Sequence, residues 1–141
     1  MKHRTGLLAL GLVTIGLLGQ AALAMAAKSQ APREDQANRR LGYLDTVDAP
    51  PTLKPKQAFV VHLQGNLPDP SWACAEPEVM TGDGVVTVRP WLRRVTTEPV
   101  MQVLVPFKLD VKVPGLAPGR WVLEVQSFGG SVSTRSIEVK P

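Results

Sequence analysis

The sequence of 141 residues is poor in the side chains that carry most enzyme chemistry. Its one cysteine is Cys74, and only one of its two histidines, His62, lies beyond residue 26. A lone cysteine excludes an internal disulfide, and a Ser-His-Asp or Cys-His arrangement would have to use His62, which no nucleophile motif accompanies. A glycine-rich phosphate loop is also missing, because Gly82-Asp83-Gly84 is better interpreted as a turn. These scarcities predict a non-enzymatic protein without a cofactor.

A long apolar run occurs only at the N-terminus. Two basic residues precede an apolar stretch over 7–18, and Ala-x-Ala cleavage sites follow it. This pattern is typical of a secretory signal peptide and predicts a signal helix within residues 1–26. The alternative is an uncleaved membrane anchor, since residues 5–27 carry no charge and are long enough to span a bilayer. In both cases we expect the remaining chain in the periplasm or secreted.

A dominant charge is missing from the rest of the chain. Residues 27–40 are polar and without hydrophobic periodicity, which predicts a flexible tether. From Leu41 onward the chain has ten Lys and Arg residues and ten Asp and Glu residues. Because nucleic-acid binding requires a basic face on the folded domain, the sequence predicts no nucleic-acid partner.

The chain beyond the tether is rich in short β-patterns separated by turns. The clearest spans 103–113, where apolar and polar residues alternate with a period of two. Similar patterns occupy 57–64, 84–92, 120–127 and 131–139, with further strands expected near 41–47 and 75–80. The thirteen prolines and twelve glycines fit this organisation. The predicted fold is all-β: an antiparallel immunoglobulin-like sandwich of about seven strands over residues 41–141.

Several residues predict local features of these strands. Pro106 indicates an edge strand or a bulge, and Pro90 an edge or a bend. The pair Gly129-Gly130 predicts a tight hairpin, and the mixed parity of 131–139 predicts a bulge in the last strand. Trp121 either pins the corner before its strand through its indole N–H or fills core volume.

Three segments resemble a group of bacterial exported and lipoprotein-type domains with an immunoglobulin-like sandwich. They are "GNLPDPSWAC" (65–74), "LVPFKLDV" (104–111) and "GLAPGRWVLEV" (115–125). The resemblance implies an accessory or interaction domain, since most of this group has no known role. It also implies a second cysteine before the VPF segment, where Met101 stands here, so Cys74 is expected to be a free thiol. An intermolecular disulfide through Cys74, giving a linked dimer, is one use that such a thiol can have.

Exposed aromatic residues beside arginines are enriched at protein interfaces. The sequence therefore indicates a contact surface for an envelope or extracellular protein; the alternative is that both tryptophans fold back over the ends of the sandwich. Membrane contact is expected only if the N-terminal segment is retained as an anchor. The candidate binding residues are Trp72, Trp91, Arg89, Arg93 and Arg94.

Two other functions stay open at this point. A periplasmic copper-binding protein would use Cys74, His62, Met80 and Met101, which form a soft ligand set suited to Cu(I), although none of them stand at a ligand spacing. A hydrolase would depend on His62.

Overall fold

A computed structural model describes residues 37–141. The expected signal segment over 1–26, and the tether up to residue 36, lie outside the described residues. Among residues 37–141 no helix has the length and apolarity needed to cross a membrane.

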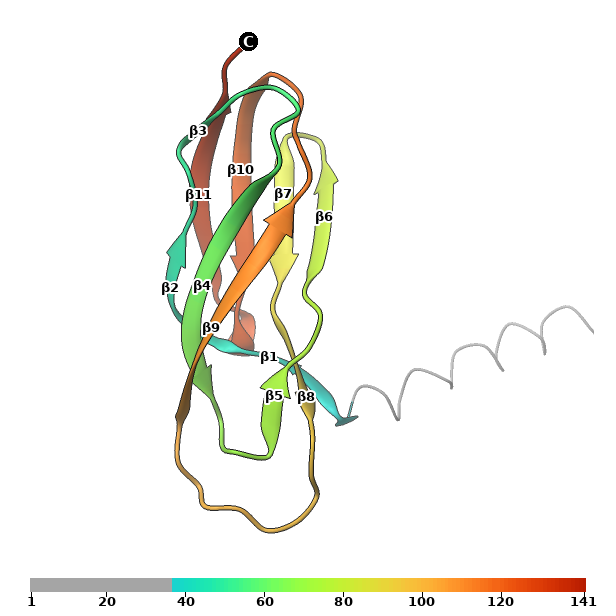
Figure 1. Cartoon of the computed structure of the whole chain (residues 1–141), viewed down its shortest axis with the longest axis vertical. Coiled ribbons are helices and arrows are strands. Elements are labelled where there is room, and N and C mark those ends of the chain that lie inside the picture. Colours follow the sequence, from blue (N-terminus) through green and yellow to red (C-terminus); the bar gives the residue numbers. More distant parts are fainter. Residues whose placement is uncertain (1–36) are drawn as a thin grey trace, which may run out of the picture. The chain divides into compact units, whose positions relative to one another are not determined.

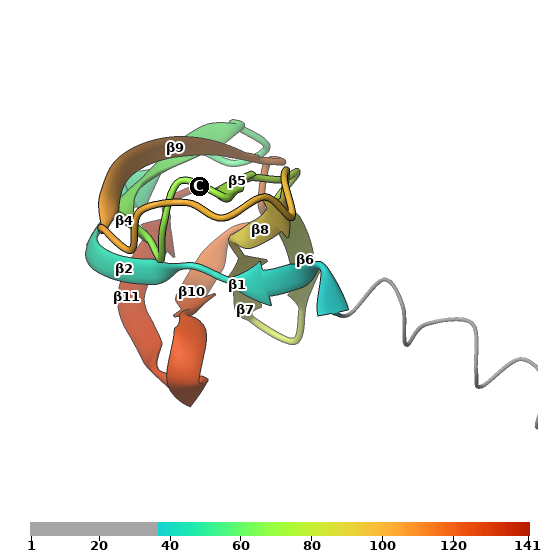
Figure 2. The same ribbon diagram turned by 90° about the horizontal axis from the view of Figure 1, so that it is seen from below.

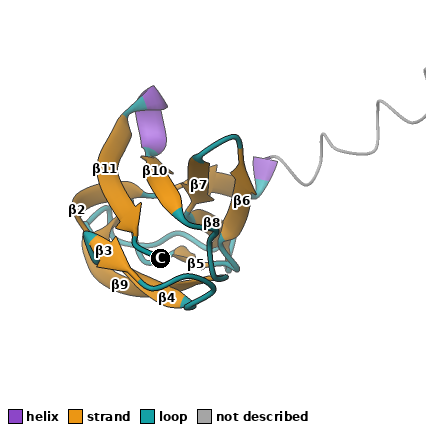
Figure 3. Cartoon of the chain, turned by 90° about the horizontal axis from the view of Figure 1, so that it is seen from above, coloured by secondary structure: helices purple, strands orange, loops and turns teal. Residues whose placement is uncertain are grey.

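The described chain is all-β, which confirms the predicted class. Its one helical element beyond residue 38 is a 3-10 turn, η1 (Phe128–Gly130), which Figure 3 shows between the last two strands. The strands in chain order are β1 (Arg39–Leu41), β2 (Tyr43–Asp48), β3 (Thr52–Leu53), β4 (Phe59–Leu67), β5 (Trp72–Cys74), β6 (Glu78–Gly82), β7 (Val85–Arg89), β8 (Trp91–Arg94), β9 (Val105–Val113), β10 (Gly119–Gln126) and β11 (Val132–Val139).

These strands form three sheets (Figure 1). One has the order β3-β11-β10-β7-β6, the second β2-β4-β9, and the third is the small sheet β1-β8-β5. The pairing is not wholly antiparallel as predicted, because β7 runs parallel to β10 and β3 runs parallel to β11. Periodicity reports which residues face a core, but it carries no information about the direction of a neighbouring strand.

The main core lies between the five-stranded sheet and the sheet β2-β4-β9, which face each other in Figure 2. The predicted alternation is confirmed in two neighbouring strands of the sheet β2-β4-β9. In β4 the residues Phe59, Val61 and Leu63 are buried while His62 and Gln64 are exposed. In β9 the buried positions alternate with exposed ones in the same way.

The two strand prolines have the structural consequences expected of them. Pro106 is exposed on β9, which is an edge strand of its sheet. Pro90 is buried and separates β7 from β8, so that the chain leaves the five-stranded sheet and enters the small sheet. A proline ends the ladder at this point because it has no N–H to donate.

The last hairpin differs from its prediction in one respect. Gly129 and Gly130 both have positive φ, at 82° and 81°, and form the predicted tight connection. The predicted bulge is wrong, because β10 and β11 pair in one unbroken register from Gly119↔Val139 to Gln126↔Val132. The bulge was expected on the assumption that Val132 is buried, whereas half of its surface is exposed.

Trp121 combines the two roles proposed for it. Its indole Nε1–H donates to the carbonyl of Ala117 at 2.9 Å, across the Pro118-Gly119 turn that leads into β10. The ring is also partly buried and packs against the main core. The tryptophan thus fixes the corner and fills volume at the same time.

A second, smaller core joins the small sheet to the sheet β2-β4-β9. Its buried members are Leu67, Trp72, Leu92 and Phe107, with Cys74 packed against them. The first strand of this sheet begins at Arg39, two residues before the expected domain boundary at 41. Arg39 and Arg40 show no apolar pattern, so only their pairing with β8 reveals that they belong to the sheet.

Candidate functional site: an arginine and tryptophan sheet

The small sheet β1-β8-β5 has an unusual composition for so few residues. Its three strands, RRL, WLRR and WAC, contain four arginines and two tryptophans and no acidic residue. The register places Arg39 opposite Arg93 and Trp72 opposite Arg94. Because side chains alternate along a strand, these residues divide between two faces. We call the face that carries Leu92 the inner face and the face that carries Trp91 the outer face.

The inner face holds Arg40 among three aromatic rings. The guanidinium carbon lies 4.0 Å from the centre of Phe128, 5.4 Å from Trp72 and 5.6 Å from Tyr43. Tyr43 and Phe128 also contact each other, with ring centres 4.7 Å apart. Cation–π attraction is strongest where the cation has lost water, and the Nε atom of Arg40 is buried without a hydrogen-bond partner in residues 37–141. The rings therefore provide most of its local stabilisation.

Ser127 fixes the position of Phe128 in this group. Its hydroxyl donates to the Gly42 carbonyl at 3.1 Å and accepts from the Leu44 N–H at 3.2 Å. The N–H of Phe128 donates to the same Gly42 carbonyl at 3.0 Å. The start of the described chain and the β10–β11 turn are thereby held together.

The outer face is organised around Trp91 and Glu78. The guanidinium of Arg39 lies 4.5 Å from the centre of the Trp91 ring. The indole Nε1–H of Trp91 donates to the carboxylate of Glu78 at 3.2 Å, and Arg89 reaches the same oxygen at 3.4 Å. Arg89 in turn donates to Gln126 at 2.9 Å. The hydrogen bond from Trp91, followed by the charges of Arg89 and Arg39, lowers the pKa of Glu78.

Arg39 and Arg93 are the unbalanced charges of this face. They occupy directly opposite positions on neighbouring antiparallel strands, where like charges destabilise the pair. Within the described residues no ion pair joins either guanidinium to a carboxylate. Their donor groups are thus free for an anionic group of a ligand.

The structure separates the five predicted binding residues into two groups. Trp91 and Arg93 share the outer face, and Glu78 links Trp91 to Arg89 on the adjacent strand β7. Trp72 and Arg94 lie on the inner face, where the guanidinium of Arg94 is 5.1 Å from the Trp72 ring. Trp72 is only 6% exposed and belongs to the second core, so it supports the site from within.

Three contributors to this site carry no clear signal in the sequence. Arg39 and Arg40 lie in the segment expected to be a tether, and Glu78 precedes Trp91 by thirteen residues. Their proximity depends on the pairing of β8 with β1 and of β6 with β7. The paired arginines in the segments "RRL" and "WLRR" were the one sequence feature that could have indicated this site.

Cys74 is a free thiol with limited access. It lies opposite Leu92 on the inner face and packs against the second core. Burial raises the pKa of its thiol, which disfavours the reactive thiolate at neutral pH.

His62 lies in a different sheet from Cys74. Its Nδ1 is 2.6 Å from a carboxylate oxygen of Asp110 on the exposed face of β4 and β9. Met80 is exposed on β6 and Met101 is exposed in the loop before β9. Within residues 37–141 no three His, Cys, Asp or Glu side chains are grouped in a way that could hold a metal ion.

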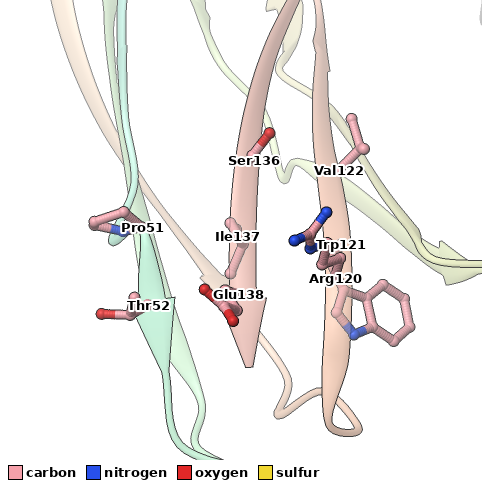
Figure 4. A pocket seen from close by; sticks show the side chains of 8 residues that line it. All are labelled: Pro51, Thr52, Arg120, Trp121, Val122, Ser136, Ile137 and Glu138. Carbon is pink, nitrogen blue, oxygen red and sulfur yellow. The ribbon is translucent and has the colours of Figure 1, made fainter. Parts of the chain in front are cut away.

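A hollow with a volume of about 520 Å³ lies over β3, β11 and β10. Figure 4 shows Arg120 and Glu138 on neighbouring strands in this hollow, where they occupy opposite positions of the β10–β11 ladder. The hollow is open and its charges are of both signs, so it offers no preference for a ligand of one charge.

No protein-family model, no curated protein and no solved structure matches this chain.

Proposed function

We propose that the chain is an exported, non-enzymatic β-sandwich of immunoglobulin-like type that serves as an interaction or accessory module in the bacterial cell envelope. The facing layers around one core and the Trp121 corner before β10 support the sandwich type. The export signal expected in residues 1–26 supports the compartment. The partner is an envelope or extracellular protein.

The observation that carries this proposal is the outer face of the small sheet. It presents two facing arginines, Arg39 and Arg93, beside a half-buried tryptophan. Arginine and tryptophan are the residues that most often dominate binding energy at protein interfaces. A partner carboxylate between the two guanidinium groups would relieve their repulsion and form charge-assisted hydrogen bonds.

A photo-crosslinking experiment in the envelope tests this function. A crosslinker at position 73, which lies opposite Arg93 on the outer face, should capture a defined protein, and Trp91→Ala should reduce the yield about tenfold, as expected for the loss of one interface anchor. The matched control is Arg135→Ala, which removes an exposed arginine on β11 and should leave the yield unchanged. An unchanged yield in Trp91→Ala would remove the outer face as the contact surface.

A further inference from the structure

Exposed apolar side chains are concentrated in one loop of this domain. The loop over 95–104 connects β8 with β9, and Figure 1 shows it at the end of the domain opposite the C-terminus. Of the nine large hydrophobic residues that are exposed in the described chain, four belong to this loop. They are Val95 (49% exposed), Met101 (76%), Val103 (46%) and Leu104 (64%). Exposed apolar side chains gathered in one loop indicate a contact with a protein or a membrane.

The polar side chains of the loop border a hollow of their own. Thr96, Thr97, Glu98 and Gln102 line a space of about 250 Å³ together with Pro99, Val100, Asp69, Ser71 and Arg94, whereas none of the four exposed apolar residues lines it. Thr97, Glu98 and Gln102 are exposed to water, as in an ordinary surface loop. The four apolar side chains are exposed as well and lie outside this hollow, so they are available for an apolar environment.

The base of the loop is held by the turn between β4 and β5. The N–H of Val95 donates to the Ser71 carbonyl at 2.8 Å. The N–H of Ser71 donates to the Asp69 carboxylate at 2.7 Å, and its hydroxyl binds the same oxygen. These two hydrogen bonds from Ser71 lower the pKa of Asp69, which keeps its carboxylate charged and able to accept them.

Around the loop, four arginines outnumber three carboxylates, those of Asp45, Asp69 and Glu98. Arg93 and Arg94 directly precede it, and Arg39 and Arg40 lie on the adjacent strand of the small sheet. The one acidic residue of the loop, Glu98, lines the polar hollow. An apolar tip flanked by arginines matches an anionic bilayer, where acyl chains accept the tip and lipid phosphates accept the guanidinium groups.

The charge of the small sheet favours a bilayer over a protein as the occupant. Arg39, Arg93 and Arg94 form no ion pair with a carboxylate of the described residues. Anionic lipid attracts each basic residue that lies near its surface.

We propose that the loop over 95–104 inserts Val95, Met101, Val103 and Leu104 into an anionic lipid surface while Arg93 and Arg94 bind lipid phosphates. This inference shares Arg93 with the protein contact proposed above but adds the loop, and vesicles without any protein partner test it separately.

An environment-sensitive fluorophore on the loop tests this proposal. The full chain carries Met101→Cys in a Cys74→Ser background, and the label is read on vesicles of phosphatidylglycerol and phosphatidylcholine. Met101 is largely exposed, so the label disturbs little packing. We expect a blue shift on the anionic vesicles and quenching by lipids brominated on their acyl chains. Arg93→Gln with Arg94→Gln should weaken the apparent affinity about 25-fold, since each basic residue near such a surface contributes about fivefold.

The matched control carries the label at position 140, through Lys140→Cys in the same Cys74→Ser background. This position lies beside the C-terminus at the other end of the domain (Figure 1). Its label should not shift on the same vesicles, even where the N-terminal segment attaches the chain to lipid.

Four outcomes would contradict the proposal. A label at position 101 that stays unshifted, or equal shifts at positions 101 and 140, would overturn it. A shift of equal size on pure phosphatidylcholine, unaffected by the arginine substitutions, would overturn the role of anionic lipid. A shift at position 101 produced by an envelope protein in the absence of vesicles, with none on vesicles alone, would assign the loop to a protein partner instead.

Discussion

The guanidinium of Arg40 lies 4.0 Å from the ring centre of Phe128, although the two residues are separated by most of the described chain. Arg40 is on β1, and Phe128 is in the turn between β10 and β11. Their contact, with Tyr43 and Trp72 on the other sides of the cation, joins the small sheet to the five-stranded sheet. The cation–π contact of Arg40 thus holds β1 against the β10–β11 turn, where an apolar side chain would be expected to do so.

Arg40→Ala should lower the free energy of unfolding by about 1–2 kcal/mol, because it removes a partly desolvated cation–π group and the packing of the arginine stem. Urea denaturation measures this change. Arg93→Ala is the control in the same sheet: it removes an exposed arginine that faces Arg39, and it should change stability by less than about 0.5 kcal/mol. Equal losses in the two variants would show that the aromatic group around Arg40 contributes nothing.

Trp91→Phe should raise the pKa of Glu78 toward its ordinary value, since the hydrogen bond from Trp91 is the largest cause of its depression. A carboxyl with a lowered pKa in the folded state stabilises the protein above its unfolded pKa, and this contribution is lost as the pH falls through the folded pKa. The variant should therefore lose less stability on acidification. NMR titration of the Glu78 carboxyl carbon measures the pKa. Trp121→Phe, which removes a hydrogen bond to a backbone carbonyl, should leave it unchanged.

Gly65→Ala should lower the free energy of unfolding by about 3 kcal/mol, because overpacking displaces backbone. A β-carbon at Gly65 would lie 1.8 Å from the carbonyl oxygen of Tyr43, beside the register shift between Leu44 and Thr46. Gly82→Ala is the matched control, as no atom lies within 4 Å of its β-carbon position. Its stability should change by less than about 0.5 kcal/mol. Thermal and urea unfolding of the pair test the close approach of β2 to β4.

Cys74 should react with a thiol reagent more slowly in the folded protein than in urea, because burial raises its pKa and the second core restricts access. The measurement is the rate of labelling across about pH 7 to 9, around the ordinary thiol pKa, with and without denaturant. Slow labelling means that a disulfide-linked dimer forms only when β5 opens. Equal rates in both states would contradict the packing of Cys74 against the second core.

The strands of the two main sheets were predictable because their side chains meet water on one face and the core on the other. The alternation in 57–64 and 103–113 records that asymmetry directly, and β4 and β9 follow it. The corner at Trp121 was predictable for a similar local reason, since the Pro118-Gly119 turn and the tryptophan are neighbours in the chain. In each of these places the residues close together in the sequence were sufficient to predict the structure.

The small sheet was not predictable as a unit, because its strands are too short to show a period. Trp72 was interpreted as a loop residue between prolines, and its burial depends on Leu67 and Phe107 from the sheet β2-β4-β9. Arg39 and Arg40 resemble a solvated basic segment until β8 is placed beside them. The candidate site therefore follows from long-range pairing, and only Trp91 and Arg93 of its outer face and the adjacent Arg89 were found in advance.

The attachment of β1 has a mechanical consequence. Hydrogen bonds join Gly42 to Pro90 and Arg94 to Asn38 at its two ends, and β8 is its one partner strand among the described residues. A pulling force on the chain upstream of Arg39 therefore loads the short β1–β8 ladder before any other part of the domain. Detaching that ladder would withdraw Arg40 from its aromatic rings and uncover the Trp72 side of the second core, while the layers around the main core stayed intact. The small sheet would thus yield to tension first and spare the rest of the domain from it.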